Sequence, residues 1–408
     1  MKFTYAKTAR DLKEIADQMG RIFRRKNWFE FYKSRMDYQT RAPYYKPEHS
    51  RIARENGKIV GHVSIVEKYL RVGSSPVKTA GIGDVFTHPD YRGRHVSSSL
   101  MKDAIQYMKR KKYPLSMLYG IPNFYHKFGY IEAMGDYKIT LPLKHAASVT
   151  SSLGIRPFRE GDIPALDRLY NENYREITGS IRRVPASWYN IADPKRLFAV
   201  EDSGGRVKGY LIYNKIWGGG GYISEAVASS EESRRALLAF ASGMARESFQ
   251  SDLEFRLGSR DPFAAFLKDF GPRVHTRFFA EGEGNAMLRL VNLSRFLKKV
   301  KPVLEERISG SCFARRKVGM NFKTDDAGRA SLLIERGKIE VSASLHPDFP
   351  VMETPQNLLT RSVLGYWSLD RLRERVRAAG GAIPSEIVPL LGMLFPPQEP
   401  FTNEPDYF

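Results

Sequence analysis

Apolar residues recur at helical spacing directly after a polar start near the beginning of the chain. Thr8 followed by Asp11 is typical of a helix N-terminus, because the two residues can cap each other's backbone amides. The apolar positions that follow are three or four residues apart or adjacent, at Leu12, Ile15, Met19, Ile22 and Phe23. This pattern predicts an amphipathic helix over residues 9–24.

The next stretches have the apolar pattern of strands and helices and are divided by turn residues. Asn56-Gly57 separates RIARE from KIVGHVSIV and predicts a two-residue β-hairpin. Farther along, the pattern predicts a strand at 78–87, a helix at 97–111, a short strand at 115–119, a short helix at 122–128 and a strand at 131–141. Together these elements predict one mixed α/β domain over residues 1–145.

A small, polar segment interrupts this pattern at residues 145–154, HAASVTSSLG, and is interpreted as a linker. After it the same order of elements returns, which predicts a second α/β domain over residues 155–286. Its predicted elements are a strand at 155–158, a helix that opens at 161–164, a hairpin around 203–205, a strand at 222–227 and a helix at 231–249.

A third domain is predicted over residues 287–408. It begins with MLRLVNLSRFLKKV, a strand leading into a helix, and has a hairpin around Arg336-Gly337-Lys338 and a helix at 369–379. Five prolines between residues 384 and 400 then lead to an extended tail that ends in Pro405-Asp406-Tyr407-Phe408.

Composition narrows the class of protein. The 408 residues are too many for one ordinary core, and an apolar share of 42% indicates a folded protein. The single cysteine, Cys312, leaves no internal disulfide and suits a reducing compartment. The N-terminus has no continuous apolar segment, and no run approaches the roughly 18 apolar residues of a membrane span. We expect a cytoplasmic protein without a membrane span.

The net charge of +20 raises the possibility of nucleic-acid binding. The basic residues, however, are scattered along the whole chain, and no zinc-finger spacing or RNA-recognition motif accompanies them. A solvated basic surface is therefore the preferred interpretation, with no nucleic acid as partner and no metal site. The charge could help to attract an anionic cofactor.

Residues 80–100, AGIGDVFTHPDYRGRHVSSSL, carry the clearest chemistry. A predicted strand ends at Val85-Phe86-Thr87, a turn at His88-Pro89-Asp90 precedes the basic Tyr91-Arg92-Gly93-Arg94, and a predicted helix follows. At a helix N-terminus, free backbone amides and the helix dipole favour an anion. The arrangement predicts a binding site for the pyrophosphate of a cofactor.

With these residues in view, the first domain resembles the GCN5-related N-acetyltransferase (GNAT) fold, and the whole chain resembles the enhanced intracellular survival (Eis) family. The resemblance rests on GIGDVFTHPDYRGR, GIPNFYHKFGY, LLTRSVLGYWSLDRL and the aromatic C-terminus. It implies tandem GNAT folds, the second degenerate, followed by a sterol-carrier-like α/β domain. It also implies acetyl-CoA as cosubstrate and a homo-oligomer, often a hexamer.

The resemblance assigns cofactor contacts in this sequence. Val85, Phe86 and Thr87 would pair with the pantetheine arm, and Gly120, Ile121 and Asn123 follow the next strand, which splays away from the first. The phosphate loop would comprise Arg92, Gly93, Arg94, His95, Val96, Ser97 and Ser98. His95 and Ser97 replace the two glycines of the family pattern. Glycine permits positive φ and close approach, so His95 either keeps the backbone cradle or crowds the pyrophosphate.

The resemblance also assigns the catalytic groups. Tyr125 would protonate the departing thiolate, although an aromatic cluster with Phe124, Phe128 and Tyr130 could be packing alone. The α-carboxylate of Phe408 would act as general base, with a frayed tail as the alternative. Asp84 is the internal rival for this role, and Asn123 could instead cap the short helix.

Two functions follow from this sequence. The first is an acetyl-CoA-dependent N-acetyltransferase acting on a primary amine, such as an aminoglycoside, a polyamine or a lysine side chain. The second is a non-catalytic CoA- or lipid-binding protein on a degenerate acetyltransferase scaffold. In the second domain, the segment AVASSEESRR has no glycine and carries two acids where a phosphate would bind, which predicts that this domain does not bind the cofactor.

Overall fold

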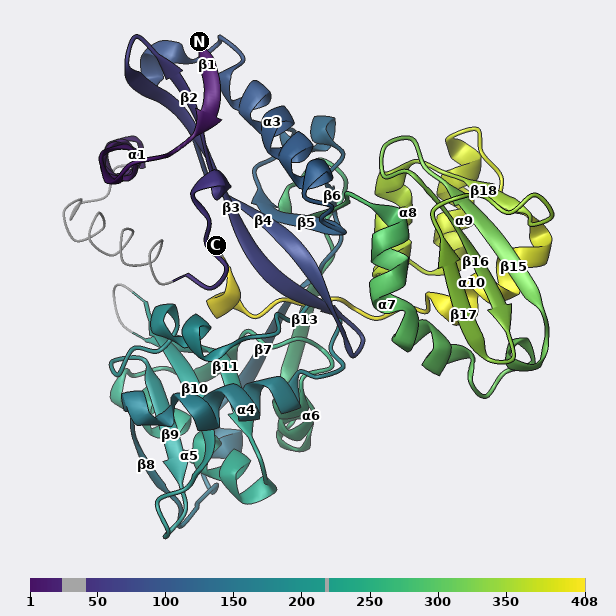
Figure 1. The fold of residues 1–408 in the computed structure, drawn as a ribbon. Helices are drawn as coiled ribbons and strands as arrows, with labels where there is room; N and C mark the ends of the chain where they lie inside the picture. Colours follow the sequence, from purple (N-terminus) through teal and green to yellow (C-terminus); the bar gives the residue numbers. More distant parts are fainter. Residues whose placement is uncertain (24–41, 217–219, 408) are drawn as a thin grey trace. The chain divides into compact units, whose positions relative to one another are not determined.

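The structure, a computed structural model, describes residues 1–23, 42–216 and 220–407 (Figure 1). The chain forms two compact units. Unit 1 contains residues 1–133 and 280–398, and unit 2 contains residues 134–279 and 399–407. Each unit is therefore assembled from segments far apart in the sequence.

The main sheet of unit 1 has seven strands in the order β1-β2-β3-β4-β5-β14-β6. The Asn56-Gly57 hairpin joins β2 to β3, with both turn residues at positive φ as this turn requires. The strands are β1 (Lys2–Tyr5), β2 (Ser50–Glu55), β3 (Lys58–Val72), β4 (Ser75–Thr87), β5 (Leu115–Gly120), β6 (Ile131–Glu132) and β14 (Asn285–Leu290).

Two helices pack on this sheet through alternating strand residues. Ile15 and Met19 of α1 (Ala9–Ile22) pack with Ile52 and Ile59, while the neighbouring Ala53 and Val60 pack with α3 (Val96–Arg110). Because successive strand residues face opposite sides, α1 and α3 cover opposite faces. Thr8 and Asp11 form the predicted capping box of α1.

The remainder of unit 1 is a four-stranded sheet with surrounding helices. Its strands lie in the order β17-β16-β15-β18, and α7 packs on β16 and β17. The elements are α7 (Leu293–Ile308), β15 (Val318–Lys323), β16 (Arg329–Glu335), β17 (Lys338–Ser342), β18 (Val351–Glu353), α8 (Gln356–Val363), α9 (Leu369–Ala378) and α10 (Val388–Leu394). The predicted hairpin and the predicted helix at 369–379 are confirmed within one or two residues.

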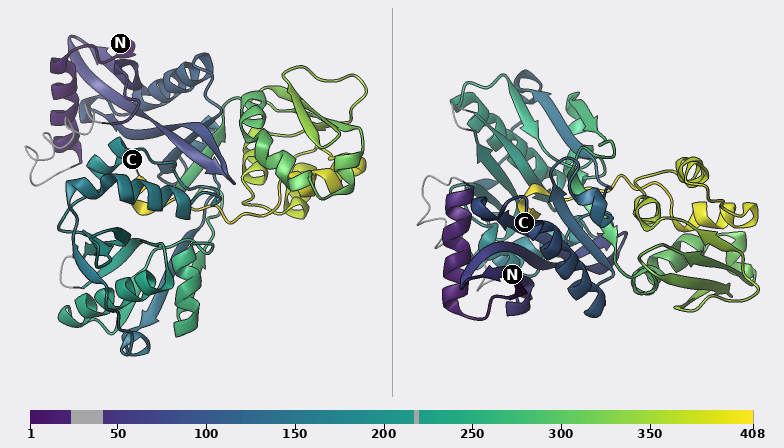
Figure 2. Two further views of the ribbon diagram at one scale, coloured as in Figure 1. Left: turned by 60° about the horizontal axis from the view of Figure 1, so that its bottom comes forward. Right: turned by 90° about the horizontal axis from the view of Figure 1, so that it is seen from above.

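Unit 2 has a seven-stranded sheet in the order β13-β7-β12-β11-β10-β9-β8. Tyr210 and Ile212 of β10 pack with α4, whereas Leu211 and Tyr213 pack with α5, so the two helices cover opposite faces (Figure 2). The elements are β7 (Asp136–Pro142), β8 (Gly154–Pro157), α4 (Ile163–Asn173), β9 (Leu197–Glu201), β10 (Val207–Lys215), β11 (Gly221–Ala228), α5 (Glu231–Glu247), β12 (Asp252–Phe255), α6 (Pro262–Leu267) and β13 (Arg273–Arg277).

Short 3-10 helices connect these elements. They are η1 (Pro47–His49), η2 (Pro89–Tyr91), η3 (Tyr125–Phe128), η4 (Leu143–Ala146), η5 (Glu160–Asp162), η6 (Pro185–Asn190), η7 (Lys268–Phe270), η8 (Cys312–Arg315), η9 (Ser385–Ile387) and η10 (Glu404–Asp406). The predicted short helix at 122–128 is thus reduced to η3, which begins at Tyr125.

Strand membership differs from the sequence prediction. The single strand predicted at 131–141 is two strands, β6 in the sheet of unit 1 and β7 in the sheet of unit 2. Conversely, β14 belongs to the main sheet of unit 1, where it pairs with β5 and β6. It was predicted to open the third domain. The chain changes unit at residues 133/134 and 279/280, whereas the predicted boundaries lie at residues 145–155 and 286/287.

The segment predicted as a linker, residues 145–154, is packed in unit 2. Ala146 and Val149 are buried in the core formed with α5 and β7. The small polar composition hides these two inward-facing apolar residues, which is why the pattern suggested a linker.

A buried carboxyl in unit 2 makes stability dependent on pH. Asp261 caps α6 through the amides of Phe263 and Ala264 and accepts a hydrogen bond of 2.5 Å from the Tyr174 hydroxyl. Burial raises the pKa of Asp261 to about 6. The folded state therefore binds more protons than the unfolded state between about pH 4 and pH 6, and stability falls as pH rises through this window.

We expect Asp261→Asn to remove this dependence while keeping the cap. Relative to the variant, the wild-type free energy of unfolding should fall between pH 4 and pH 6 by up to about 1.4 kcal/mol per pH unit. Urea denaturation of both proteins across this range measures the difference. Parallel curves for the two proteins would contradict it.

Candidate active site

The site begins where β4 and β5 stop pairing. The two strands are parallel and paired only over Thr79–Ile82 and Leu115–Leu118, after which β4 continues to Thr87 and β5 to Gly120. On its other side, β4 has a bulge opposite β3, where Asp84 adopts a φ of 50°. The predicted separation of the two strands is thus present, and it leaves an edge of β4 open.

The turn after β4 leads into the N-terminus of α3. Gly93 and His95 both adopt positive φ, 77° and 56°, and His95 is the N-cap residue of α3. Among the described residues, no side chain caps α3 through a hydrogen bond. The first amides of a 15-residue helix are therefore available to an anion.

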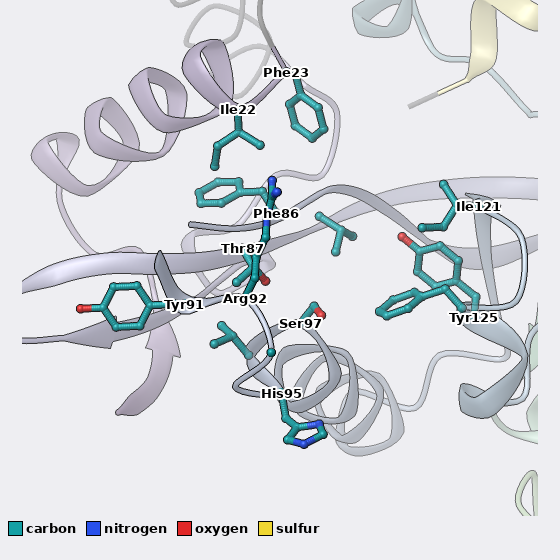
Figure 3. Close-up of a pocket in the computed structure, with 14 residues that line it drawn as sticks. Ile22, Phe23, Phe86, Thr87, Tyr91, Arg92, His95, Ser97, Ile121 and Tyr125 are labelled. Carbon is teal, nitrogen blue, oxygen red and sulfur yellow. The ribbon is translucent and has the colours of Figure 1, made fainter. Parts of the chain in front are cut away.

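His95 takes the left-handed conformation that the family pattern assigns to glycine. Its imidazole is exposed and points away from the other labelled residues (Figure 3). The backbone at this position is therefore not in an ordinary conformation, and the imidazole points outward (Figure 3). Retention of the backbone cradle and crowding of the pyrophosphate both stay predictions.

A cavity of about 350 Å³ occupies the space between the strand ends, the turn and α3. Ser97 and Thr87 contribute hydroxyls and Arg92 contributes a cation, and none of the described residues that line it is acidic. The lining residues are Ile22, Phe23, Val85, Phe86, Thr87, Tyr91, Arg92, Gly93, His95, Val96, Ser97, Ile121, Phe124 and Tyr125 (Figure 3).

Ten of the predicted site residues line this cavity, and four predicted cofactor contacts do not. The guanidinium of Arg94 lies over the Tyr91 ring, 5.0 Å from its centroid. Asn123 is exposed and has a φ of 56°. Its backbone N–H donates to the carbonyl of Gly282, and its side chain does not cap η3. The other two are Ser98 and Gly120.

Gly120 has no side chain, and this leaves room for the side chains of Met287 and Tyr125. A Cβ at this position would lie 2.5 Å from Sδ of Met287 and 3.0 Å from Cδ2 of Tyr125. Any larger residue would displace the Tyr125 ring from its position beside the cavity.

Tyr125 is buried, with its hydroxyl directed toward the cavity (Figure 3). Its ring packs edge-on against Phe124, with centroids 4.8 Å apart, and against Tyr130. Burial raises the pKa of Tyr125 above 10. The phenol is therefore protonated at neutral pH, as a general acid must be, so packing and catalysis are compatible roles for it.

Thr87 supplies a polar group without a protein partner. Its Oγ1 is buried and has no hydrogen-bond partner among the described residues. An orphaned hydroxyl in a cavity wall is costly unless a ligand or water satisfies it. Together with the uncapped α3, it fits a cavity that receives a polar, anionic ligand.

Sequence reasoning missed part of the cavity wall. Ile22 and Phe23 come from the end of α1, and Tyr91 and Phe124 come from the two loops. The available signal for this part of the wall was the pair of apolar residues at the end of the predicted first helix. In the structure Phe23 is 46% exposed.

The two candidate bases have different positions. Asp84 lies in the β4 bulge, where its carbonyl accepts a hydrogen bond of 3.0 Å from Nδ1 of His62, and it does not line the cavity. Phe408 lies outside the described residues. The residues before it are not frayed: Phe401, Thr402, Asn403 and Asp406 are all buried in unit 2.

Further observations concern membranes and metals. Within residues 1–23, 42–216 and 220–407, no helix is both long and apolar enough to cross a bilayer. Over the same residues, no group of three or more His, Cys, Asp or Glu side chains could hold a metal ion.

Comparisons with known proteins agree with this geometry. Residues 6–133 match a family model described as an acetyltransferase (GNAT) domain, and residues 179–290 match a second model with the same description. No curated protein matches the chain significantly.

Solved structures share the fold over the whole chain. A protein from Enterococcus faecalis, described as of unknown function and a probable N-acyltransferase, is 18% identical, with a TM-score of 0.78 over 100% of this chain and 99% of that one. A GCN5-related N-acetyltransferase from Anabaena variabilis is 18% identical (TM-score 0.74), and Eis1 from Mycobacterium abscessus is 17% identical (TM-score 0.67). Both alignments cover 100% of each chain. The predicted fold of tandem GNAT domains is confirmed, while a sterol-carrier-like third domain stays a prediction.

The left-handed His95 gives a test of the turn. We expect His95→Gly to raise the free energy of unfolding by about 1 kcal/mol, because a non-glycine residue in this region is strained. Urea denaturation measures the change. His95→Ala, which removes the imidazole but keeps the strain, is the matched control; equal stabilisation by both variants would contradict a backbone cause.

Proposed function

We propose that this chain, an N-acetyltransferase with two tandem GNAT domains, uses its first domain to transfer an acetyl group from acetyl-CoA to a primary amine. The observation that carries the proposal is the cavity where β4 and β5 separate. It is lined on one side by a basic turn with an uncapped helix and on the other by a buried, protonated tyrosine.

The phosphate end of the cofactor would lie at the turn. Arg92 and the amides of Val96 and Ser97 offer a cation and backbone donors at the positive end of α3, and the Ser97 hydroxyl adds another donor. Because Gly93 is open on the side where a Cβ would point, the backbone can be approached there.

The pantetheine arm would follow the open edge of β4. Beyond Ile82 this edge is not paired with β5, so the backbone groups of residues 83–87 can bond an extended amide chain. Thr87 Oγ1, buried without a described partner, can bond the same arm.

The reaction requires one acid and one base. The cofactor supplies an activated thioester: the amine nitrogen attacks its carbonyl carbon, the C–N bond forms, and the C–S bond breaks. Tyr125 would give its proton to the departing sulfur, which its raised pKa allows at neutral pH. The proton lost by the attacking amine goes to the base.

The α-carboxylate of Phe408 is the proposed base. The burial of Phe401, Thr402, Asn403 and Asp406 supports a defined tail rather than a frayed one. A free α-carboxylate has a pKa of about 3.5, so its site must desolvate it to make it an effective base. An aminoglycoside, polyamine or lysine side chain is the proposed acceptor, and the working form is the predicted homo-oligomer.

We expect Arg92→Ala to weaken CoA binding about tenfold, because a charged hydrogen bond to phosphate is lost at a partly exposed site. Isothermal titration calorimetry with CoA measures this. Arg94→Ala is the matched control and should have a smaller effect, because its guanidinium lies on Tyr91. Equal losses in both variants would contradict the assignment, and no binding by the wild type up to millimolar CoA would favour the non-catalytic alternative.

We expect Tyr125→Phe to lower kcat about 100-fold with little change in the affinity for CoA, because only the proton donor is removed. Release of free thiol, followed with a dye over a panel of polyamines and aminoglycosides, measures kcat. Tyr5→Phe, on β1 of the same unit, is the control. A wild-type kcat in Tyr125→Phe would exclude this tyrosine as the acid.

A further inference from the structure

The second domain repeats the strand separation of the first. Its β11 and β12 are parallel and paired only at Tyr222–Ile223 and Glu254–Phe255, which leaves residues 224–228 of β11 without a β12 partner. In the first domain this position holds the cavity. In the second, Glu225 from this part of β11 binds Arg183, which also binds Asp406 near the end of the chain.

Residues 399–406, here called the C-terminal segment, belong to unit 2, and their 3-10 helix η10 packs against β11. The amide of Phe401 donates to the carbonyl of Thr178 over 3.0 Å, and the Thr402 hydroxyl donates to the carbonyl of Gly179 over 2.6 Å. Gly179 and Gly258 are needed for this approach, since a Cβ at either would lie 2.6 or 2.9 Å from Phe401.

A buried ionic group holds the last part of the segment. Arg183 donates from Nε and Nη2 to the two carboxylate oxygens of Asp406, each over 3.0 Å, and binds Glu225 of β11 in a bidentate pair at 2.6 and 2.7 Å. The Tyr170 hydroxyl donates to Asp406 over 2.9 Å. The side chains of Arg183 and Glu225 are 0% exposed, and that of Asp406 is 3% exposed. These four residues are called the Arg183 cluster below.

The charges of the Arg183 cluster indicate which residue can be replaced with the smaller loss of charge balance. Arg183 and Glu225 neutralise each other, so the Asp406 carboxylate is a second anion beside a single cation. Removing the charge of Asp406 leaves a balanced pair, whereas removing Arg183 would leave two buried carboxylates without a cation. Asp406 can therefore be altered without unbalancing the core of unit 2.

The second domain also lacks the anion site of the first. Ser230 caps α5 by accepting from the amide of Ser233 over 3.2 Å, whereas α3 has no such cap among the described residues. This domain therefore has a side-chain cap on α5 and holds a segment of its own chain against β11.

We propose that the Arg183 cluster is a positioning site for the C-terminal segment: it binds Asp406 and thereby fixes the position of this segment on the second domain. The proposal rests on the proposed function, in which the α-carboxylate of Phe408 is the base. Arg183, Tyr170 and Asp406 are positioning residues, since none of them touches the reacting atoms.

Asp406→Asn in the full chain tests this proposal, with Glu404→Gln as the matched control. Glu404 lies in the same segment but is 29% exposed and accepts from Tyr222 and Arg256 near the surface. Hydrogen exchange, read by mass spectrometry, reports on the segment independently of activity. We expect exchange of residues 400–406 to rise at least about tenfold in Asp406→Asn and to change little in Glu404→Gln.

Kinetics provide the second measurement. We expect kcat of Asp406→Asn to fall about tenfold while KM for acetyl-CoA stays within about twofold, because the base is misplaced and the cofactor site is untouched. If α4 and β11 also lose protection, Tyr170→Phe replaces Asp406→Asn, since it removes one hydrogen bond and no charge; smaller changes in the same direction are then expected.

Deletion of Phe408 separates the proposal from the proposed function. Unchanged exchange of residues 400–406 in Asp406→Asn would overturn the positioning site, whatever the activity. Raised exchange with full kcat, where the Phe408 deletion is inactive, would overturn it as well. Raised exchange with a fully active Phe408 deletion would instead overturn the base assignment and leave the anchoring role supported.

Discussion

The end of the pairing between β4 and β5 is the constraint on which the first domain's site depends. Four residue pairs hold the two parallel strands together, and beyond them β4 leads to the basic turn and α3 while β5 leads to Tyr125. The cavity is therefore an opening in a sheet, and one wall of it is backbone. The backbone groups of such a wall can bond an extended amide chain whatever side chains surround them.

Local elements could be predicted from the sequence because their signals are local. The Thr8 and Asp11 cap and the Asn56-Gly57 turn each act within a few residues, and both are present. The turn at residues 88–94 and the helix after it were predicted on the same basis, and both are present. The backbone of His95 was not foreseen, because histidine gives no sign of the left-handed conformation that the neighbouring chain imposes on it.

Sheet membership could not be predicted, because it depends on partners far apart in the sequence. Apolar and polar residues alternate over residues 131–141 as in one strand, and Gly135 is the only glycine or proline among them. Whether Ile131 and Tyr137 join the same sheet depends on β14 and β13, more than 100 residues away. An alternating pattern records which face of a strand is buried but not which strand lies beside it.

The Arg183 cluster connects β11 of the second domain to the C-terminal segment through buried charges. Burying an ion pair in place of apolar residues adds little stability, and the carboxylate of Asp406 adds a second negative charge beside Arg183. Burial accordingly raises the pKa of Glu225 despite its bidentate pairing with Arg183. Stability alone thus does not account for an aspartate at this position. What the arrangement provides is specificity: only a carboxylate spaced correctly from Phe401 can accept from Arg183 and Tyr170 together, so the segment binds in a single register.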